Sequence, residues 1–125
     1  MRKVTQIARY LFALMLLVFG LNKFLGFMEM PPMPEPAQAY MAALASTGVM
    51  FPLLGILYVL SAIALVTNKF AALMLLTLCP VAVNILVFHA TLAPGGIAPG
   101  IIFTVLLILS LLHYKPKYEP LLKAA

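Results

Sequence analysis

Five polar side chains in a mostly apolar sequence have the chemistry to hold a ligand: Asn22, Lys23, Glu29, Asn84 and His89. An ammonium, an imidazole, a carboxylate and two carboxamides can donate hydrogen bonds to a carbonyl oxygen and accept them from a hydroxyl. Such a set suits the headgroup of a quinone or a polar segment of a partner protein. We predict that these five residues form one polar cluster, which requires the fold to bring two distant segments together.

These residues do not make a complete catalytic site. The chain has one cysteine, Cys79, and two histidines, so it offers no intrachain disulfide and no Cys and His cluster for zinc. The arrangement of segments described below places His89 and His113 at opposite ends, roughly 30 Å apart, so one haem iron cannot take both. Cys79 lies in an apolar segment, where a thiol stays protonated and unreactive. We expect no metal site, and we favour a role other than that of an enzyme.

The composition is that of an integral membrane protein. Of the 125 residues, 65% are hydrophobic and 9% are charged, and the mean hydropathy is +1.13. Soluble domains carry roughly one quarter charged residues, because their surfaces face water. The net charge of +5 comes from basic residues scattered between apolar segments rather than from one patch. Nucleic acid is therefore excluded as a partner, and the lipid bilayer is the expected one.

Four apolar segments are long enough to cross a bilayer, about residues 10–27, 49–67, 70–89 and 97–114, and Lys23 is the one charged residue within them. At ~1.5 Å per residue, each helix would span about the ~30 Å of the hydrocarbon core. The segments are too long and too uniformly apolar for barrel strands. We predict an all-α polytopic membrane protein, an antiparallel bundle of four transmembrane helices in a single domain, residues 1–125. The short connection "TNKF" makes the second and third helices neighbours.

The distribution of lysine and arginine predicts which way the helices run. In a four-span arrangement, Lys23 falls on one side of the membrane and the other seven basic residues fall on the opposite side. Basic loops stay in the cytoplasm, so we expect both termini there. The segment 28–48 and the polar residues around it then lie on the outer side.

The outer segment begins with four prolines, at positions 31, 32, 34 and 36. We expect them to end the first helix, because proline lacks an amide donor and favours extended backbone. If the first helix persists to Glu29, then Asn22, Gly26 and Glu29 share one helical face.

A second, shorter helix is expected within the outer segment. Glu35 followed by Pro36 is typical of a helix start, since a carboxylate and a first-turn proline both suit that end. "AQAYMAALAS" would then form an amphipathic helix at the outer interface or across the end of the bundle. Tyr40 and Leu44, with Ala43 or Met41, would make its apolar side.

Asn84 and His89 reach the same outer side from the third span. Asn84 lies roughly two-thirds of the way across, where a carboxamide facing lipid is costly, so it should face another helix. The alternative to one cluster leaves each residue separate. In that case Lys23 extends to the headgroups, Glu29 is solvated, Asn84 bonds between helices and His89 ends its helix.

Several motifs together resemble the DoxX family of small four-helix membrane proteins over essentially the whole chain. They are an early Arg9, "FGLNKF", "VTNKFAAL" and "LCPVAVNILVFH", in this order and spacing. The resemblance implies a bacterial cytoplasmic-membrane protein, and some members of the family are associated with oxidoreductase systems, whereas many have no assigned activity. One departure is evident: many members carry a glutamate on the second helix four residues before a glycine, and Tyr58 and Ala62 stand at the matching positions here. Chemistry that depends on that glutamate is not expected in this chain.

Three functions follow from these observations. The first is an accessory or quinone-associated subunit of a membrane redox system, whose polar cluster binds a quinone headgroup or an exported redox protein. The second is a non-catalytic scaffold or assembly factor that recognises another membrane protein. The third is a binder of a lipid or small apolar molecule, for which methionines near the outer side provide an adaptable surface.

Overall fold

The computed structural model describes residues 2–27 and 32–123, and these residues form helices without any strand. The α-helices are α1 (Arg2–Leu25), α2 (Glu35–Ser46), α3 (Met50–Thr67), α4 (Ala71–Thr91), α5 (Ile97–His113) and α6 (Lys115–Tyr118), with 3-10 turns at Pro94–Gly96 and Glu119–Leu122. Four helical stretches, namely α1, α3, α4 and Pro94–His113, are long and apolar enough to cross a membrane. The prediction of an all-α bundle of four apolar helices is confirmed.

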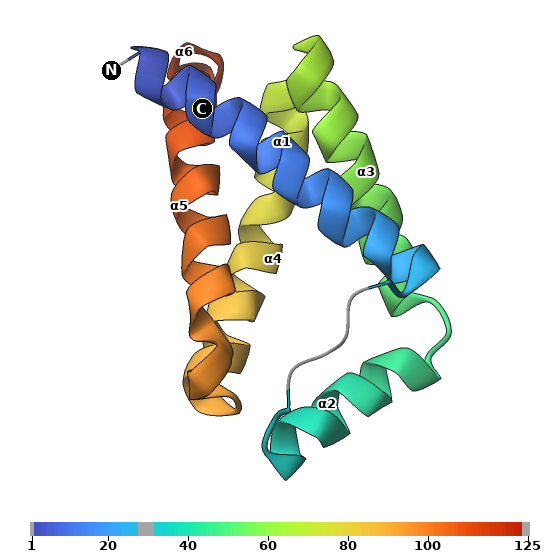
Figure 1. Ribbon diagram of the computed structural model, residues 1–125. Coiled ribbons are helices and arrows are strands. Elements are labelled where there is room, and N and C mark those ends of the chain that lie inside the picture. Colours follow the sequence, from blue (N-terminus) through green and yellow to red (C-terminus); the bar gives the residue numbers. More distant parts are fainter. Residues whose placement is uncertain (1, 28–31, 124–125) are drawn as a thin grey trace.

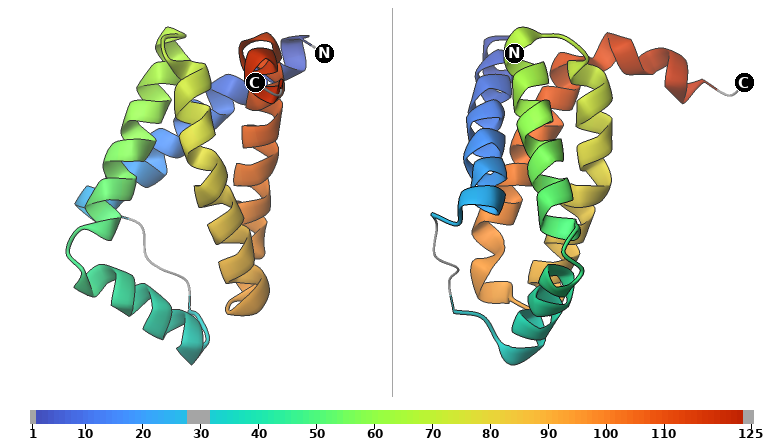
Figure 2. Two further views of the ribbon diagram at one scale, coloured as in Figure 1. Left: turned by 180° about the vertical axis from the view of Figure 1, so that it is seen from behind. Right: turned by 90° about the vertical axis from the view of Figure 1, so that its right-hand side faces the viewer.

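The four long helices form a ring in the order α1, α3, α4, α5 (Figures 1 and 2). An aromatic cluster at the centre joins three of them: the Phe12 and Phe103 rings lie 5.0 Å apart edge to face, and Tyr58 lies 5.8 Å from Phe103. These buried rings provide apolar contact between the three helices at the centre of the bundle. The remaining core is mainly leucine and alanine, as expected for helices that approach closely.

Helix α1 crosses the bundle obliquely (Figure 1). Its first half contacts the end of α5, where Thr5 meets His113, and its second half packs against the start of α3. Two glycines allow the close crossing with α3. A Cβ atom on Gly20 would lie 2.9 Å from the Tyr58 Cβ, and one on Gly55 would lie 2.6 Å from the Phe24 ring. The crossing therefore depends on residues without side chains.

The ends of α1 differ from the sequence prediction. The helix begins at Arg2, eight residues before the predicted apolar span, because basic side chains at a helix end can reach water. It ends at Leu25, where Gly26 adopts a left-handed backbone with φ 61° and donates to the Asn22 carbonyl. Gly26 therefore lies outside the helix, so it does not share a helical face with Asn22. Glu29 lies outside the described residues.

Helix α2 begins where the sequence predicted. Glu35 is its first residue, and Pro36 occupies the first turn. The helix lies across one end of the bundle (Figures 1 and 2) and contacts α3. Ala37 is its buried residue, and the Tyr40 ring lies 5.1 Å from the Phe88 ring of α4. Helix α2 is thus held along one side and remains largely exposed on the other.

The two ends of the bundle differ in composition. The start of α1, the turn between α3 and α4, and α6 lie at one end, and α2 and the Pro94–Gly96 turn lie at the other (Figure 1). Seven of the eight basic residues belong to segments of the α6 end. The α3–α4 turn is tight, with Asn68 and Phe70 both left-handed at φ 59° and 58°. Because the start of α1 and α6 lie at the same end, the helices agree with an even number of membrane crossings.

Candidate ligand cavity

A cavity of about 450 Å³ lies at the α2 end of the bundle, and all five of the longer helices contribute to its wall. Most of the wall is apolar, with four methionines and four phenylalanines. The polar members are Lys23, Tyr40, Tyr58, Asn84 and His89. This volume is in the range of pockets that hold small organic ligands, and such pockets combine apolar walls with a few polar groups.

The oblique course of α1 places the cavity at this end. Phe12 and the residues before it keep α1 against α5, whereas Gly20 and Lys23 lie against α3. The second half of α1 therefore packs on α3, and α2 lies across the end that α1 and α5 leave open (Figure 1).

Lys23 lies in the last turn of α1, half-buried in the cavity wall. Its ammonium lies 5.6 Å from the centre of the Phe51 ring and 5.8 Å from that of Tyr58. Aromatic faces attract a cation, but they do not replace hydrogen bonds to oxygen. Among the described residues, no carboxylate or other acceptor meets this ammonium. Lys23 can therefore donate to an oxygen atom of a ligand.

Asn84 faces the cavity from the middle of α4. Its carboxamide and the Tyr40 hydroxyl lie 3.4 Å apart, which is a long hydrogen bond between α4 and α2. The partner is on another helix, as the cost of a carboxamide in lipid requires. The Asn84 side chain is nevertheless exposed, because the cavity lies beside it. This weak contact is the polar connection between α2 and α4.

His89 lies in the last turn of α4, and one of its two ring nitrogens forms a hydrogen bond. Its Nδ1 lies 2.9 Å from the Ile85 carbonyl, which can only accept, so the proton is on Nδ1. Neutral His89 then presents Nε2 as an acceptor. The ring lies beside two glycines: a Cβ atom on Gly96 would lie 3.7 Å from Nε2 and one on Gly100 would lie 3.6 Å from Nδ1, both at ordinary contact distance.

The structure brings three of the five predicted site residues to one cavity: Lys23, Asn84 and His89. Asn22 precedes Lys23 on α1, is half-buried, and does not line the cavity. Glu29, as noted, lies outside the described residues. Two further polar residues, Tyr40 and Tyr58, line the cavity and were absent from the predicted cluster.

Sequence spacing contains a signal for one of the two tyrosines. Phe51, Leu54 and Tyr58 occur at i, i+3 and i+7 on α3, which places them on one face of that helix. All three line the cavity. Because α3 is apolar on every side, this spacing alone does not distinguish the cavity face from the lipid face.

A separate polar network closes the α6 end. Arg9 is 5% exposed and donates to the Tyr114 hydroxyl at 2.9 Å and to the Tyr10 hydroxyl. Tyr114 in turn donates to Asn68 Oδ1 at 2.6 Å, which links α1, α5 and the α3–α4 turn. The Arg9 Nε is buried without a partner among the described residues. The sequence prediction treated Arg9 as a marker of orientation, but here it also connects the helices.

Two more hydrogen bonds support this end. The Thr5 hydroxyl donates to the Arg2 carbonyl at 3.0 Å, so its oxygen accepts from His113 Nδ1, also at 3.0 Å. Tyr118 of α6 donates to the Ala72 carbonyl at 2.8 Å, and burial raises the pKa of Tyr118 to about 12. Hydrogen bonds thus tie α5 to α1 and α6 to α4 at this end.

In comparisons with known proteins, no family model, no curated protein and no solved structure matches this chain. The resemblance to the DoxX family therefore stays a prediction. Within residues 2–27 and 32–123, no three His, Cys, Asp or Glu side chains form a group that could hold a metal ion. The cavity offers binding chemistry: one cation, one imidazole and apolar walls.

Proposed function

We propose that this chain is a DoxX-like accessory subunit of a membrane redox system and that it holds a quinone headgroup in the cavity at the α2 end. One observation supports the proposal most: Lys23 and His89 line the same apolar cavity, and each has hydrogen-bonding capacity that no described residue uses. A quinone is an apolar molecule with carbonyl oxygens, and this combination suits it.

Each polar group would have a definite part in binding. The Lys23 ammonium would donate to a quinone carbonyl, and charged donors give the stronger hydrogen bonds. His89 Nε2 would accept from the hydroxyl of a reduced quinone, since Nδ1 is held by Ile85. Methionine and phenylalanine side chains would contact the ring and the start of the apolar tail.

We also propose that the protein lies in a bacterial cytoplasmic membrane with both termini in the cytoplasm. The support is the concentration of basic residues in segments of the α6 end. The α2 end would then face outward, and an exported or membrane-bound redox protein would approach the cavity over α2. Labelling of single cysteines introduced at positions 47 and 69 from outside intact cells tests this: only position 47 should react.

The ligand proposal is tested by extracting the protein in mild detergent and quantifying bound quinone by mass spectrometry. The wild type should retain quinone near one per chain. Lys23→Ala should retain at least about tenfold less, because a hydrogen bond to a charged group contributes ~1.5–3 kcal/mol. His89→Ala should retain roughly two- to tenfold less of the reduced form, because a hydrogen bond between neutral groups contributes ~0.5–1.5 kcal/mol. Lys69→Ala, which removes a cation at the opposite end, is the matched control and should match the wild type. Absence of quinone from the wild type would contradict the proposal.

A second candidate is binding of a lipid or another apolar molecule in the same cavity. The four methionines of the wall, Met15, Met33, Met41 and Met50, favour it, because flexible thioethers adapt to an irregular chain. The same extraction distinguishes the two. A lipid that co-purifies near one per chain, resists exchange for quinone and is unaffected by Lys23→Ala would favour this candidate.

A scaffold or assembly role is supported by α2, whose side away from the cavity is exposed and consists mainly of small residues. A photoreactive residue at position 39 or 42 should then trap one defined membrane partner. Capture of many unrelated proteins would count against the role.

A further inference from the structure

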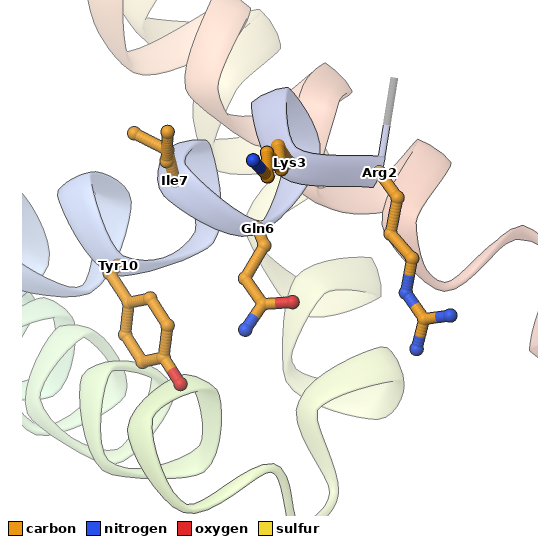
Figure 3. A pocket seen from close by; sticks show the side chains of 5 residues that line it. All are labelled: Arg2, Lys3, Gln6, Ile7 and Tyr10. Carbon is orange, nitrogen blue, oxygen red and sulfur yellow. The ribbon is translucent and has the colours of Figure 1, made fainter.

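An open hollow of about 470 Å³ lies on the first two turns of α1, at the end of the bundle opposite the cavity. It is lined by Arg2, Lys3, Gln6, Ile7 and Tyr10. Figure 3 shows the side chains of Arg2, Gln6 and Tyr10 extending to the same side of the helix. Their spacing of four residues puts them one above another on that face.

The hollow is rich in hydrogen-bond donors and poor in acceptors. The side chains of Arg2, Lys3 and Gln6 have no hydrogen-bond or ion-pair partner among the described residues. The Tyr10 oxygen accepts from Arg9, so the hydroxyl hydrogen of Tyr10 remains to be donated. None of the residues that line the hollow is acidic. A guanidinium, an ammonium, an amide and a phenol together match the oxygen atoms of a phosphate.

The charged residues that line the hollow are both basic. The described acidic residues are Glu35, on α2 at the far end, and Glu119, which follows α6 at the same end as the hollow. Seven basic residues belong to segments at this end of the bundle, so the charge there is mainly positive. An anion that approaches the start of α1 therefore meets a positive potential, which is the complement of an anionic membrane surface.

An apolar stripe continues from the hollow along α1. Val4, Ile7, Leu11 and Leu14 recur at intervals of three and four residues, so they share one helical face, and each is at least half exposed. Ile7 belongs both to the stripe and to the hollow. A phosphate held by Arg2 and Lys3 would therefore have an apolar surface beside it for an acyl chain. Free inorganic phosphate has no acyl chain to place on this apolar surface, whereas a phospholipid has one.

We propose that the hollow on the first two turns of α1 is a docking site for an anionic phospholipid, with its phosphate on Arg2, Lys3, Gln6 and Tyr10 and an acyl chain along the stripe. Arg9 positions Tyr10, since the buried guanidinium bonds to the Tyr10 oxygen and lies 4.4 Å from its ring centre. Arg9 is itself fixed by Tyr114. The site is independent of the cavity and of the proposed function.

The test uses the full-length protein in nanodiscs of equal parts phosphatidylglycerol and phosphatidylcholine, with native mass spectrometry of the lipids that stay bound on release. The wild type should retain one phosphatidylglycerol in preference to phosphatidylcholine. Arg2→Gln with Lys3→Gln should weaken this preference about 25-fold, at about fivefold for each cation near the surface. Lys117→Gln with Lys123→Gln removes the same charge at the same end, outside the hollow, and should change the preference by no more than about twofold.

Several results would overturn the proposal. They are equal losses in the two double variants, no preference in the wild type, and displacement of the lipid by millimolar inorganic phosphate. Should the Arg2 and Lys3 variant fail to fold, Gln6→Ala with Tyr10→Phe keeps every charge and removes two donors. Because both lipids carry a phosphate, the measurement for this variant is the amount of phosphatidylglycerol retained. It should fall at least about tenfold, which is the least expected for one hydrogen bond to a charged group. An unchanged amount in that variant would equally contradict the site.

Discussion

The two ends of the bundle use similar polar residues in opposite ways. At the α6 end, Arg9 is buried and donates to Tyr10 and Tyr114. At the α2 end, Lys23 meets two aromatic rings and no described acceptor, in the wall of an open cavity. A basic residue near each end of α1 thus stabilises the fold at one end and offers a ligand contact at the other. The surroundings of each basic residue, rather than its residue type, determine which of the two roles it has.

The largest expected effect is from Arg9→Ala. The substitution removes two hydrogen bonds from a charged donor and leaves space in a packed region, so the free energy of unfolding should fall by about 3 kcal/mol. Thermal or denaturant unfolding in detergent, followed by circular dichroism, measures this. Lys23→Ala is the matched variant at the open end and should cost less than about 1 kcal/mol. Equal losses would remove the distinction between the ends.

A somewhat smaller loss is expected from Gly20→Val. A Cβ atom there would lie 2.9 Å from the Tyr58 Cβ and 3.0 Å from the Val59 side chain, so α1 and α3 must separate. Overpacking of this kind costs about 2 kcal/mol, and it should also disturb the cavity, because Tyr58 is part of its wall. The melting temperature and the amount of bound ligand should both fall.

Gly95→Val is the control for the crossing, since a Cβ atom on Gly95 would meet nothing within 4 Å. Its melting temperature should stay close to that of the wild type. If Gly20→Val were equally stable, the oblique crossing of α1 would not depend on this glycine.

The smallest effect is expected from Tyr40→Phe, which removes the long hydrogen bond between α2 and Asn84 but keeps the ring against Phe88. The stability of the whole chain should change by no more than about 0.5 kcal/mol. Hydrogen exchange of the α2 amides should become faster, whereas exchange in α4 should not change. Slower or unchanged exchange in α2 would show that this contact does not hold α2 over the cavity.

Much of the fold was predictable because membrane helices need long apolar segments. The four spans and the start of α2 at Glu35 follow from local composition alone. The end of α1 was not predictable in the same way: four prolines follow closely, but Gly26 with its left-handed backbone ends the helix first. A strong local signal therefore predicted the right kind of boundary at the wrong residue.

The candidate site was predictable only in part, because it depends on how helices cross. Lys23, Asn84 and His89 were expected near one another from topology, since each lies toward the same end of its span. Tyr58 lines the cavity where Gly20 lets α1 approach α3 closely. The sequence alone does not show which helices come into contact in this way. The Arg9 network joins residues more than 100 positions apart, so its role as a connector required the folded structure.

The most direct test of the quinone-binding cavity is photolabelling with a quinone that carries a photoreactive group on its ring, followed by peptide mass spectrometry. We predict labelling of Met15 and Phe19 on α1 and of Asn84 and His89 on α4, which line the cavity, and competition by unlabelled quinone. Labelling that falls on lipid-facing residues such as Leu14 or Leu73, or that unlabelled quinone does not reduce, would contradict the cavity as a quinone site.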